Sequence, residues 1–265
     1  MKGTPMTPSA ELDARCQLLR SLHVPGEPLL LPNAWDAATA KAVEAAGFPV
    51  VATTSGGVAE ALGYEDHEGG PAEAMLAAAA RIGSAVTVPL TVDAEAGYGM
   101  EPADLVAALK RIGAAGCNLE DTNHASGDLR EPSEQADWLG RVRKAARADD
   151  YDLVINARID VFLSALMSGS EGGQEELLDD ALARANAYLD AGADCVFPIL
   201  LHEEAAIRTF TSGAGGAVNI TALPQAPSIA ELAKLNVARI SYGLLLYRNQ
   251  MESFSAALAS LRSAD

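Results

Sequence analysis

Two carboxylates stand two residues apart in this sequence, directly after an apolar run. Asp93 and Glu95 follow residues 86–90, whose composition is typical of a buried strand. At the period of a strand, both side chains point the same way. Burying two like charges is costly without a counter-charge, and Mg²⁺ or Mn²⁺ would supply one through oxygen ligands. The alternative is an acidic turn at Gly97 and Gly99, where glycine lets the backbone bend sharply.

Two further charged side chains follow predicted strands. Glu120 adds a third acid to Asp93 and Glu95, and the three form an oxygen-rich set that suits Mg²⁺. Arg158 offers a planar fork for a carboxylate or phosphonate of a small anionic substrate. The alternative for Arg158 is a structural ion pair with Asp160. We therefore expect the acids to hold the metal and Arg158 to be a catalytic residue that holds the anion.

Uncharged polar residues gather at the same strand ends. The segment Thr54-Ser55-Gly56-Gly57 offers hydroxyl and backbone N–H groups to an anionic oxygen, or is an ordinary turn. Within it, Thr54 is assigned a catalytic role, and Ser55, Gly56 and Gly57 are assigned to substrate binding. His124 is predicted as a general acid, with a solvated loop histidine as the alternative. Asn123 and Asn219 are also assigned to substrate binding.

The elements that position these residues follow one repeated pattern of apolar run, polar turn and amphipathic helix. The runs predict eight strands, at Leu29–Pro32, Val50–Thr53, Val88–Val92, Cys117–Glu120, Leu153–Ala157, Cys195–Ile199, Ala217–Ile220 and Arg239–Ser241. The segments between them predict helices at Ala37–Ala46, Ala72–Gly83, Pro102–Ala115, Glu134–Ala148, Glu175–Ala191, Glu203–Phe210 and Ile229–Leu235. An extra N-terminal helix is expected at Ser9–Leu22, after a loose tail over residues 1–8, and a final helix at Glu252–Arg262.

Strict alternation of strand and helix predicts a parallel sheet. Eight such units in 265 residues predict a closed (β/α)₈ barrel of the TIM type, a single domain over residues 1–265. The alternative is an open doubly wound sheet. In a (β/α)₈ barrel the active site lies at the carboxyl ends of the strands, where the polar residues gather in this sequence.

Composition limits the partners of this chain. Its 19 basic and 36 acidic residues give a formal net charge of −17, which argues against nucleic acid and anionic membrane as partners. We expect no signal peptide and no membrane span. Cys16, Cys117 and Cys195 are far apart and odd in number, without the spacing of a metal site or a disulfide framework. A reducing cytoplasm is the expected location.

Together these motifs resemble the isocitrate lyase/phosphoenolpyruvate mutase superfamily, over about residues 31–242. The segment 93–99 resembles the family's D-A-D-x-G-Y-G, 119–121 its L-E-D, 157–160 its A-R-x-[ED], and 55–59 its oxyanion loop. The resemblance places Asp66 where an acid approaches the metal waters. It implies an Mg²⁺-dependent enzyme acting on a 2-oxo acid or its enolate. It also implies a homotetramer in which neighbouring subunits exchange the last helix, so a homo-oligomer, dimer or tetramer, is expected.

The sequence also departs from the family's branches. Members that cleave C–C bonds usually carry K-[KR]-C-G-H after the fourth strand, whereas residues 122–128 contain neither cysteine nor lysine. Those lyases often have glutamate where this chain has Ile199, yet residues 219–221 resemble their N-I-T. Phosphoenolpyruvate mutases have lysine where this chain has Thr122. The resemblance therefore implies the superfamily without selecting a branch.

Three functions remain open from the sequence. The first is a lyase-type enzyme that cleaves a C–C bond of a small 2-oxo, 2-hydroxy or dicarboxylic acid, or decarboxylates it, through an enolate. The second is a C–P mutase or hydrolase of the phosphonopyruvate type. The third is a barrel that only binds a metabolite, against which the intact acids and Arg158 count.

Overall fold

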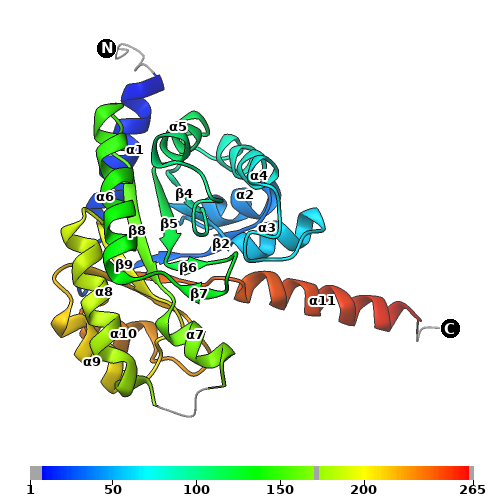
Figure 1. Cartoon of the computed structure of the whole chain (residues 1–265). Coiled ribbons are helices and arrows are strands. Elements are labelled where there is room, and N and C mark those ends of the chain that lie inside the picture. Colours follow the sequence, from blue (N-terminus) through cyan, green and yellow to red (C-terminus); the bar gives the residue numbers. More distant parts are fainter. Residues whose placement is uncertain (1–7, 170–172, 263–265) are drawn as a thin grey trace.

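The structure is a computed structural model that describes residues 8–169 and 173–262 (Figure 1). Its main sheet contains the strands β1 (Leu29–Leu31), β2 (Asn33–Ala34), β3 (Val51–Thr53), β4 (Leu90–Asp93), β5 (Gly116–Glu120), β8 (Val154–Ile159), β9 (Cys195–Pro198), β10 (Ala217–Thr221) and β11 (Arg239–Ser241). Their order is β1-β11-β10-β9-β8-β5-β4-β3-β2, and every pairing is parallel. The strands are buried almost throughout, as expected when helices cover a parallel sheet.

The sheet closes on itself at Pro32. This residue has no N–H group to donate, and it separates β1 from β2 along one extended segment. β1 pairs with β11, while β2 pairs with β3. The nine strands therefore fill eight positions of a barrel, which confirms the predicted fold and excludes the open doubly wound sheet.

Helices follow the strands in turn and surround the barrel (Figure 1). They are α2 (Ala37–Ala45), α4 (Ala72–Ser84), α5 (Pro102–Arg111), α6 (Pro132–Ala148), α8 (Leu178–Asp190) after the short 3₁₀ turn η1 (Gln174–Leu177), α9 (Glu204–Gly213) and α10 (Ile229–Lys234). The predicted N-terminal helix is present as α1 (Pro8–Ser21). Residues 1–7 of the predicted tail lie outside the described residues.

α1 lies against the end of the barrel opposite the polar strand ends. Its Arg20 pairs with Asp152, which precedes β8, at 2.6 Å, and with Asp194, which precedes β9, at 2.8 Å. Both acids stand at the amino ends of their strands. The N-terminal helix therefore links the amino ends of β8 and β9 and does not cover the carboxyl ends of the strands.

Several short elements differ from the sequence prediction. The segment read as a loop after the second strand begins a helix, α3 (Ser55–Leu62), and a further helix, α7 (Val161–Met167), follows β8. A two-stranded antiparallel hairpin, β6 (Thr122–Asn123) and β7 (Asp128–Leu129), follows β5. Elements of two to eight residues carry little periodicity, and the first turn of α3 contains two glycines, which disfavour helix without tertiary packing.

The last helix is longer than predicted. α11 (Leu245–Arg262) begins seven residues before Glu252, and in Figure 1 it projects away from the barrel. Tyr247 is its buried residue and packs edge-on against Trp35, with ring centroids 5.2 Å apart. Within residues 8–169 and 173–262, no helix is both long and apolar enough to cross a membrane.

Candidate active site at the carboxyl ends of the strands

Asp93 ends β4 with its carboxylate held on two sides. The backbone N–H of Ser55 donates to Asp93 Oδ2 at 3.1 Å, and the amide of Asn118 lies 3.5 Å from Oδ1. Ser55 is the first residue of α3, so the positive end of that helix faces the carboxylate. The ordinary turn considered for this segment is therefore wrong, because its N–H groups belong to a helix N-terminus directed at Asp93.

The two glycines of α3 allow the chain to pack closely around this point. A Cβ atom on Gly56 would lie 2.7 Å from Oδ2 of Asp66, and one on Gly57 would lie 2.7 Å from Cγ2 of Thr54. Real Cβ atoms essentially never approach so near, so any larger residue at either position would force Asp66 or Thr54 to move. Asp66 is thereby brought over the first turn of α3, while Thr54 precedes the helix and its side chain makes no cap hydrogen bond.

Glu95 is held in a crowded, acidic loop. Its φ of 49° is left-handed, as are those of Glu68 at 58° and Tyr98 at 56°. The Glu68 N–H donates to the Glu95 carboxylate, and the Tyr98 N–H donates to Glu68 Oε1 at 2.6 Å. Burial, with the charges of Asp93, Glu120 and Asp66, raises the pKa of Glu95 to about 8. Burial is the larger cause of this shift, and the neighbouring acids add to it.

Glu120 ends β5 between two cationic partners. Its Oε2 lies 2.5 Å from Arg158 Nη1, and its Oε1 lies 2.6 Å from His124 Nε2. Burial outweighs the attraction to Arg158 and raises the pKa of Glu120 to about 7. The contact with Glu120 raises the pKa of His124, although burial alone would lower it. The His124 side chain is only 9% exposed, so the alternative of a solvated loop histidine is wrong.

Arg158, on β8, is fully engaged in the structure. Its Nε and Nη2 donate to the two oxygens of Asp160 at 2.6 and 3.1 Å, and its Nη1 meets Glu120. Asp160 also accepts a hydrogen bond from the Thr122 hydroxyl at 2.5 Å. The ion pair with Asp160 is therefore present. A substrate carboxylate at Arg158 would have to share the guanidinium with Asp160 or displace Glu120.

Two predicted substrate contacts make no hydrogen bond to the acids. Asn123 is exposed in the β6–β7 hairpin, where its Oδ1 accepts the N–H of Ala125 at 3.1 Å. Asn219 is fully buried on β10 and donates to Ser241 Oγ at 3.0 Å, while its Oδ1 has no protein partner. The structure thus brings together the predicted acids, Arg158, His124 and the α3 N-terminus, whereas the hydrogen bonds of the two asparagines go to other groups.

Other residues of the site were not singled out from the sequence. Glu68 reaches the site only because the loop after α3 folds back onto Glu95. Asn118 and Arg239 meet inside the barrel from opposite strands, β5 and β11, with Arg239 Nη2 3.1 Å from Asn118 Oδ1. The one available signal was a charged arginine at the start of an otherwise apolar strand.

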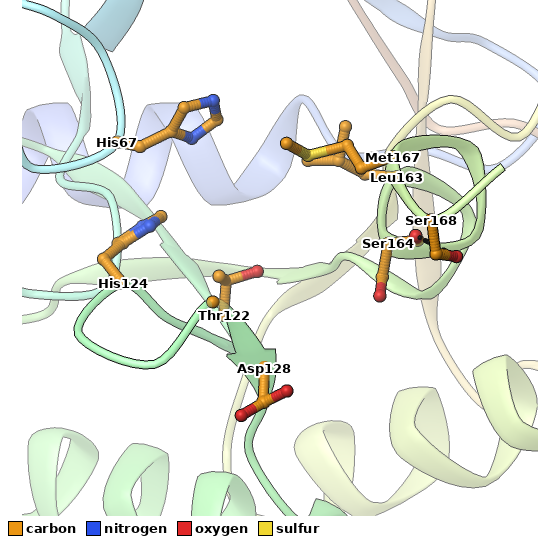
Figure 2. Close-up of a pocket in the computed structure, with 9 residues that line it drawn as sticks. His67, Thr122, His124, Asp128, Leu163, Ser164, Met167 and Ser168 are labelled. Atoms are coloured by element: carbon orange, nitrogen blue, oxygen red, sulfur yellow. Dashed lines mark hydrogen bonds between the residues drawn. The ribbon is translucent and has the colours of Figure 1, made fainter.

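A cavity of about 470 Å³ opens beside the Glu120 and Arg158 contacts. Figure 2 shows that residues of the β6–β7 hairpin, the loop after α3 and α7 surround it. Its lining residues are His67, Thr122, His124, Gly127, Asp128, Leu163, Ser164, Met167 and Ser168. Asp93, Glu95 and Glu120 form an acid cluster. His124 contacts Glu120 of this cluster and Thr122 contacts Asp160, the partner of Arg158, so a ligand in the cavity would lie next to the candidate catalytic groups.

A sequence profile described as phosphoenolpyruvate phosphomutase matches residues 19–262. The chain belongs to this family. It is also 31% identical over 251 residues to the 2-methylisocitrate lyase of Escherichia coli (strain K12), covering 86% of this chain and 81% of that protein. The match confirms the resemblance of the motifs. The family belongs to a superfamily of lyases and mutases that act on C–C or C–P bonds.

Solved structures agree with the barrel. A crystal structure from Burkholderia cenocepacia J2315 is 41% identical, with a TM-score of 0.88, and covers 94% of this chain and 99% of that one. A structure of 2,3-dimethylmalate lyase, described as a PEP mutase/isocitrate lyase superfamily member, is 23% identical, with a TM-score of 0.81, covering 95% of this chain and 85% of that one. Because the dimethylmalate lyase structure is only 23% identical to this chain, it supports the shared fold and nothing further.

The donor set of this family member fits a hard divalent cation. Carboxylate oxygens of Asp93, Glu95 and Glu120 are the ligands that Mg²⁺ prefers. Burial first, and neighbouring acids second, raise the pKa values of Glu95 and Glu120, so a cation would stabilise their charged forms. In the part of the chain that the structure describes, no three His, Cys, Asp or Glu side chains converge tightly enough to hold one ion directly.

Proposed function

We propose that this chain is an Mg²⁺-dependent lyase that cleaves a C–C bond of a small 2-oxo or 2-hydroxy acid through an enolate. The observation that carries the proposal is the crowding of Asp93, Glu95 and Glu120 next to Arg158, where β4, β5 and β8 end. Enzymes of the superfamily generally depend on Mg²⁺. Mn²⁺ would satisfy the same oxygen ligands.

Asp93 would hold the cation most directly, with Glu95, Glu120 and Asp66 acting through its waters. When bound, the cation supplies positive charge against the oxygens of the substrate's 2-oxo or 2-hydroxy acid end. Arg158 would bind the substrate carboxylate by sharing its guanidinium with Asp160 or by releasing Glu120. The Ser55 N–H is taken by Asp93. Thr54, the hydroxyl of Ser55 and the N–H groups of Gly56 and Gly57 would remain for the oxygen that becomes negative during cleavage, as in an oxyanion hole.

Cleavage of a 2-hydroxy acid requires one proton acceptor and one proton donor. The acceptor removes the hydroxyl proton at C2, the C2–O bond becomes a carbonyl, and the C2–C3 bond breaks with its electron pair remaining on C3. The donor then protonates C3. We assign the donor to His124, because its ring lines the cavity beside Glu120 and is held in place through the contact between Nε2 and Glu120 Oε1 at 2.6 Å.

A second candidate is a mutase or hydrolase acting on a C–P bond. The family description favours it, and Arg158 with the α3 N-terminus would suit a phosphonate as well as a carboxylate. Thr122 stands where mutases of this type have lysine, and the 122–128 segment has no cysteine of the C–C lyase type. Because these two departures do not separate the reactions, our preference for C–C cleavage rests on two points. They are the acid cluster and the similarity to 2-methylisocitrate lyase.

The test is a substrate panel on the full chain. Oxaloacetate, 2-methylisocitrate, 2,3-dimethylmalate and phosphonopyruvate are each assayed with Mg²⁺ and after chelation, in both directions where products are stable. We expect Mg²⁺-dependent release of a 2-oxo acid from one of the C–C substrates. Asp93→Asn should lose this activity. Asp104→Asn should keep it, because Asp104 is an exposed residue of α5. Turnover of phosphonopyruvate alone would select the C–P alternative.

We also propose that the protein works in the cytoplasm as a homo-oligomer. Cys16, Cys117 and Cys195 are free and buried, which fits a reducing compartment. The exposed apolar residues of α11 support self-association. Neither nucleic acid nor a membrane is expected as a partner, since the net charge is −17.

A further inference from the structure

The cavity beside Glu120 and Arg158 differs in chemistry from the acid cluster. In Figure 2, His67, His124 and Thr122 form one side, and Leu163 and Met167 of α7 form another. The Thr122 hydroxyl is used by Asp160, and His124 Nε2 is used by Glu120. The cavity is therefore next to the groups that would bind and protonate the substrate, but its free surface is made by other side chains.

The cavity offers no lysine or arginine to an anionic group. Its described lining residues include Asp128, which adds a negative charge, and two histidines, His67 and His124. The charge that His124 could carry is already paired with Glu120. A carboxylate placed here would lie near Asp128 without a lysine or arginine partner, which is unfavourable. An uncharged part of the substrate therefore suits this space better than a carboxylate.

The remaining surface favours a substituent with alkyl character. Leu163 and Met167 provide apolar side chains. Met167 is 72% exposed, so a ligand could still cover part of its apolar surface. The hydroxyl groups of Ser164 and Ser168 lie on the same helical face and can serve a neutral oxygen. A volume of about 470 Å³ leaves room for more than a methyl group.

We propose that this cavity is the subsite for an uncharged, alkyl-type substituent on C3 of the substrate. This inference rests on the proposed lyase function and names its substrate class: C3-alkyl malates and related acids, rather than acids with a further carboxylate on the C3 branch. The carboxylates common to the whole class remain with Arg158, the α3 N-terminus and the cation. The cavity then determines specificity through the C3 branch.

The experiment compares two substrates that differ only at this branch. 2,3-Dimethylmalate carries a methyl group on C3 where 2-methylisocitrate carries a carboxymethyl group. We expect kcat/KM to be at least tenfold higher for 2,3-dimethylmalate. Replacing its C3 methyl by ethyl should raise kcat/KM further, by up to about fourfold, since burial of one methylene contributes roughly 0.8 kcal/mol.

Two variants on α7 locate the effect. Met167→Arg puts a cation into the cavity and should shift the preference toward 2-methylisocitrate by at least tenfold. Leu166→Arg is the matched control, because Leu166 is 68% exposed on the same helix and does not line the cavity. It should leave the ratio of the two kcat/KM values unchanged. Circular dichroism and thermal unfolding verify that both variants fold.

The outcomes separate the inference from the function on which it rests. Faster turnover of 2-methylisocitrate by the unmodified chain overturns the subsite and leaves the lyase function standing. Equal ratios for Met167→Arg and Leu166→Arg also overturn the role of the cavity. If neither these two compounds nor any other C–C substrate of the panel is turned over, both the lyase function and the subsite are overturned.

Discussion

The guanidinium of Arg239 lies inside the barrel with Nη2 3.1 Å from Oδ1 of Asn118, 121 residues away in sequence. Asn156 Nδ2 donates to the same oxygen at 2.8 Å. Two donors thus fix which end of the Asn118 amide is the oxygen, and its Nδ2 is left facing Asp93. Arg239 is 1% exposed, Nη1 has no protein partner, and burial lowers its pKa to about 10, so it remains charged at neutral pH.

A buried charge without a carboxylate partner predicts an unusual mutational effect. Arg239→Met should leave the free energy of unfolding unchanged or raise it by up to about 3 kcal/mol, because a well-packed apolar side chain replaces an unpaired buried ion. At the same time kcat/KM should fall at least tenfold, since Asn118 loses the donor that orients it toward Asp93. Urea unfolding and steady-state kinetics measure the two effects.

Arg184 provides the matched control for this prediction. It is similarly buried, but its Nη1 pairs with Asp121 Oδ2 at 3.0 Å. Arg184→Met would leave that acid unpaired and should lower the free energy of unfolding by about 3–5 kcal/mol. If Arg239→Met destabilises the chain as much as Arg184→Met does, the guanidinium of Arg239 is a structural group instead.

Removal of Asp93 tests the proposed cation. Asp93→Ala should abolish turnover and leave the fold intact, because removing one acid from a cluster relieves repulsion. Binding of Mn²⁺, followed by electron paramagnetic resonance, should weaken in parallel, and Asp104→Ala should change neither. Wild-type activity of Asp93→Ala in chelator-treated buffer would show that the metal role is wrong.

Arg158→Lys tests the anion site. Lysine is a point charge and cannot replace the fork that meets Asp160 and Glu120, so kcat/KM should fall on the order of a hundredfold, or roughly 3 kcal/mol. Initial rates with the substrate found in the panel give this value. A tenfold or smaller loss, together with a lower unfolding midpoint, would assign Arg158 to the structural ion pair with Asp160.

His23 makes the fold sensitive to mild acid. Its Nδ1 bonds the carbonyl of Leu19 at 2.8 Å and its buried Nε2 has no partner, and burial together with the Arg239 charge lowers the pKa to about 4. Because this pKa is depressed from 6.5, the unfolded chain binds the proton first as the pH falls. The free energy of unfolding should therefore decrease between about pH 6.5 and 4, by at most roughly 3 kcal/mol from this residue.

Replacement of His23 by an uncharged side chain measures that contribution. His23→Gln keeps a group able to donate to Leu19 and cannot take up the proton. Urea unfolding at pH 7 and pH 5 should give a smaller difference for His23→Gln than for the unmodified chain. His202→Gln is the control, because His202 lies on another part of the barrel. An unchanged pH difference in His23→Gln would contradict the assignment.

The exposed face of α11 predicts an exchanged helix in an oligomer. Phe254, Leu258 and Leu261 are 53%, 47% and 72% exposed in the single chain, at spacings that place them on one side of the helix. We propose that a second copy covers them, because exchange of an identical element is a common route to symmetric assembly. Truncation after Gln250 should reduce the mass measured by light scattering and lower the thermal midpoint.

A double variant separates packing from length. Phe254→Asp with Leu258→Asp keeps the full chain and places charges on the same face, so it should also dissociate the oligomer. A shortened protein that keeps the full-length mass and thermal midpoint would contradict the exchange. In that case the helix would cover its own barrel in solution.

The sequence determined the barrel and much of the site, because both depend on local patterns. Apolar runs alternating with amphipathic helices predicted all eight strand positions. Asp93, Glu95, Glu120 and Arg158 were recognised because each follows or ends such a run, and parallel strands carry their carboxyl ends to one rim. The short elements α3, α7 and the β6–β7 hairpin were not predicted, because their residues adopt helix or strand only when the barrel packs against them.

Only the tertiary structure decided how these groups are paired. Glu68 reaches Glu95 through loops that meet in space, and Arg239 reaches Asn118 across the barrel interior. Charge states follow from the same cause: burial and converging acids raise the pKa of Glu95 to about 8, which no spacing of residues reveals. Spacing along a chain fixes which face a side chain occupies. Desolvation and hydrogen-bond partners arise only when distant segments come together.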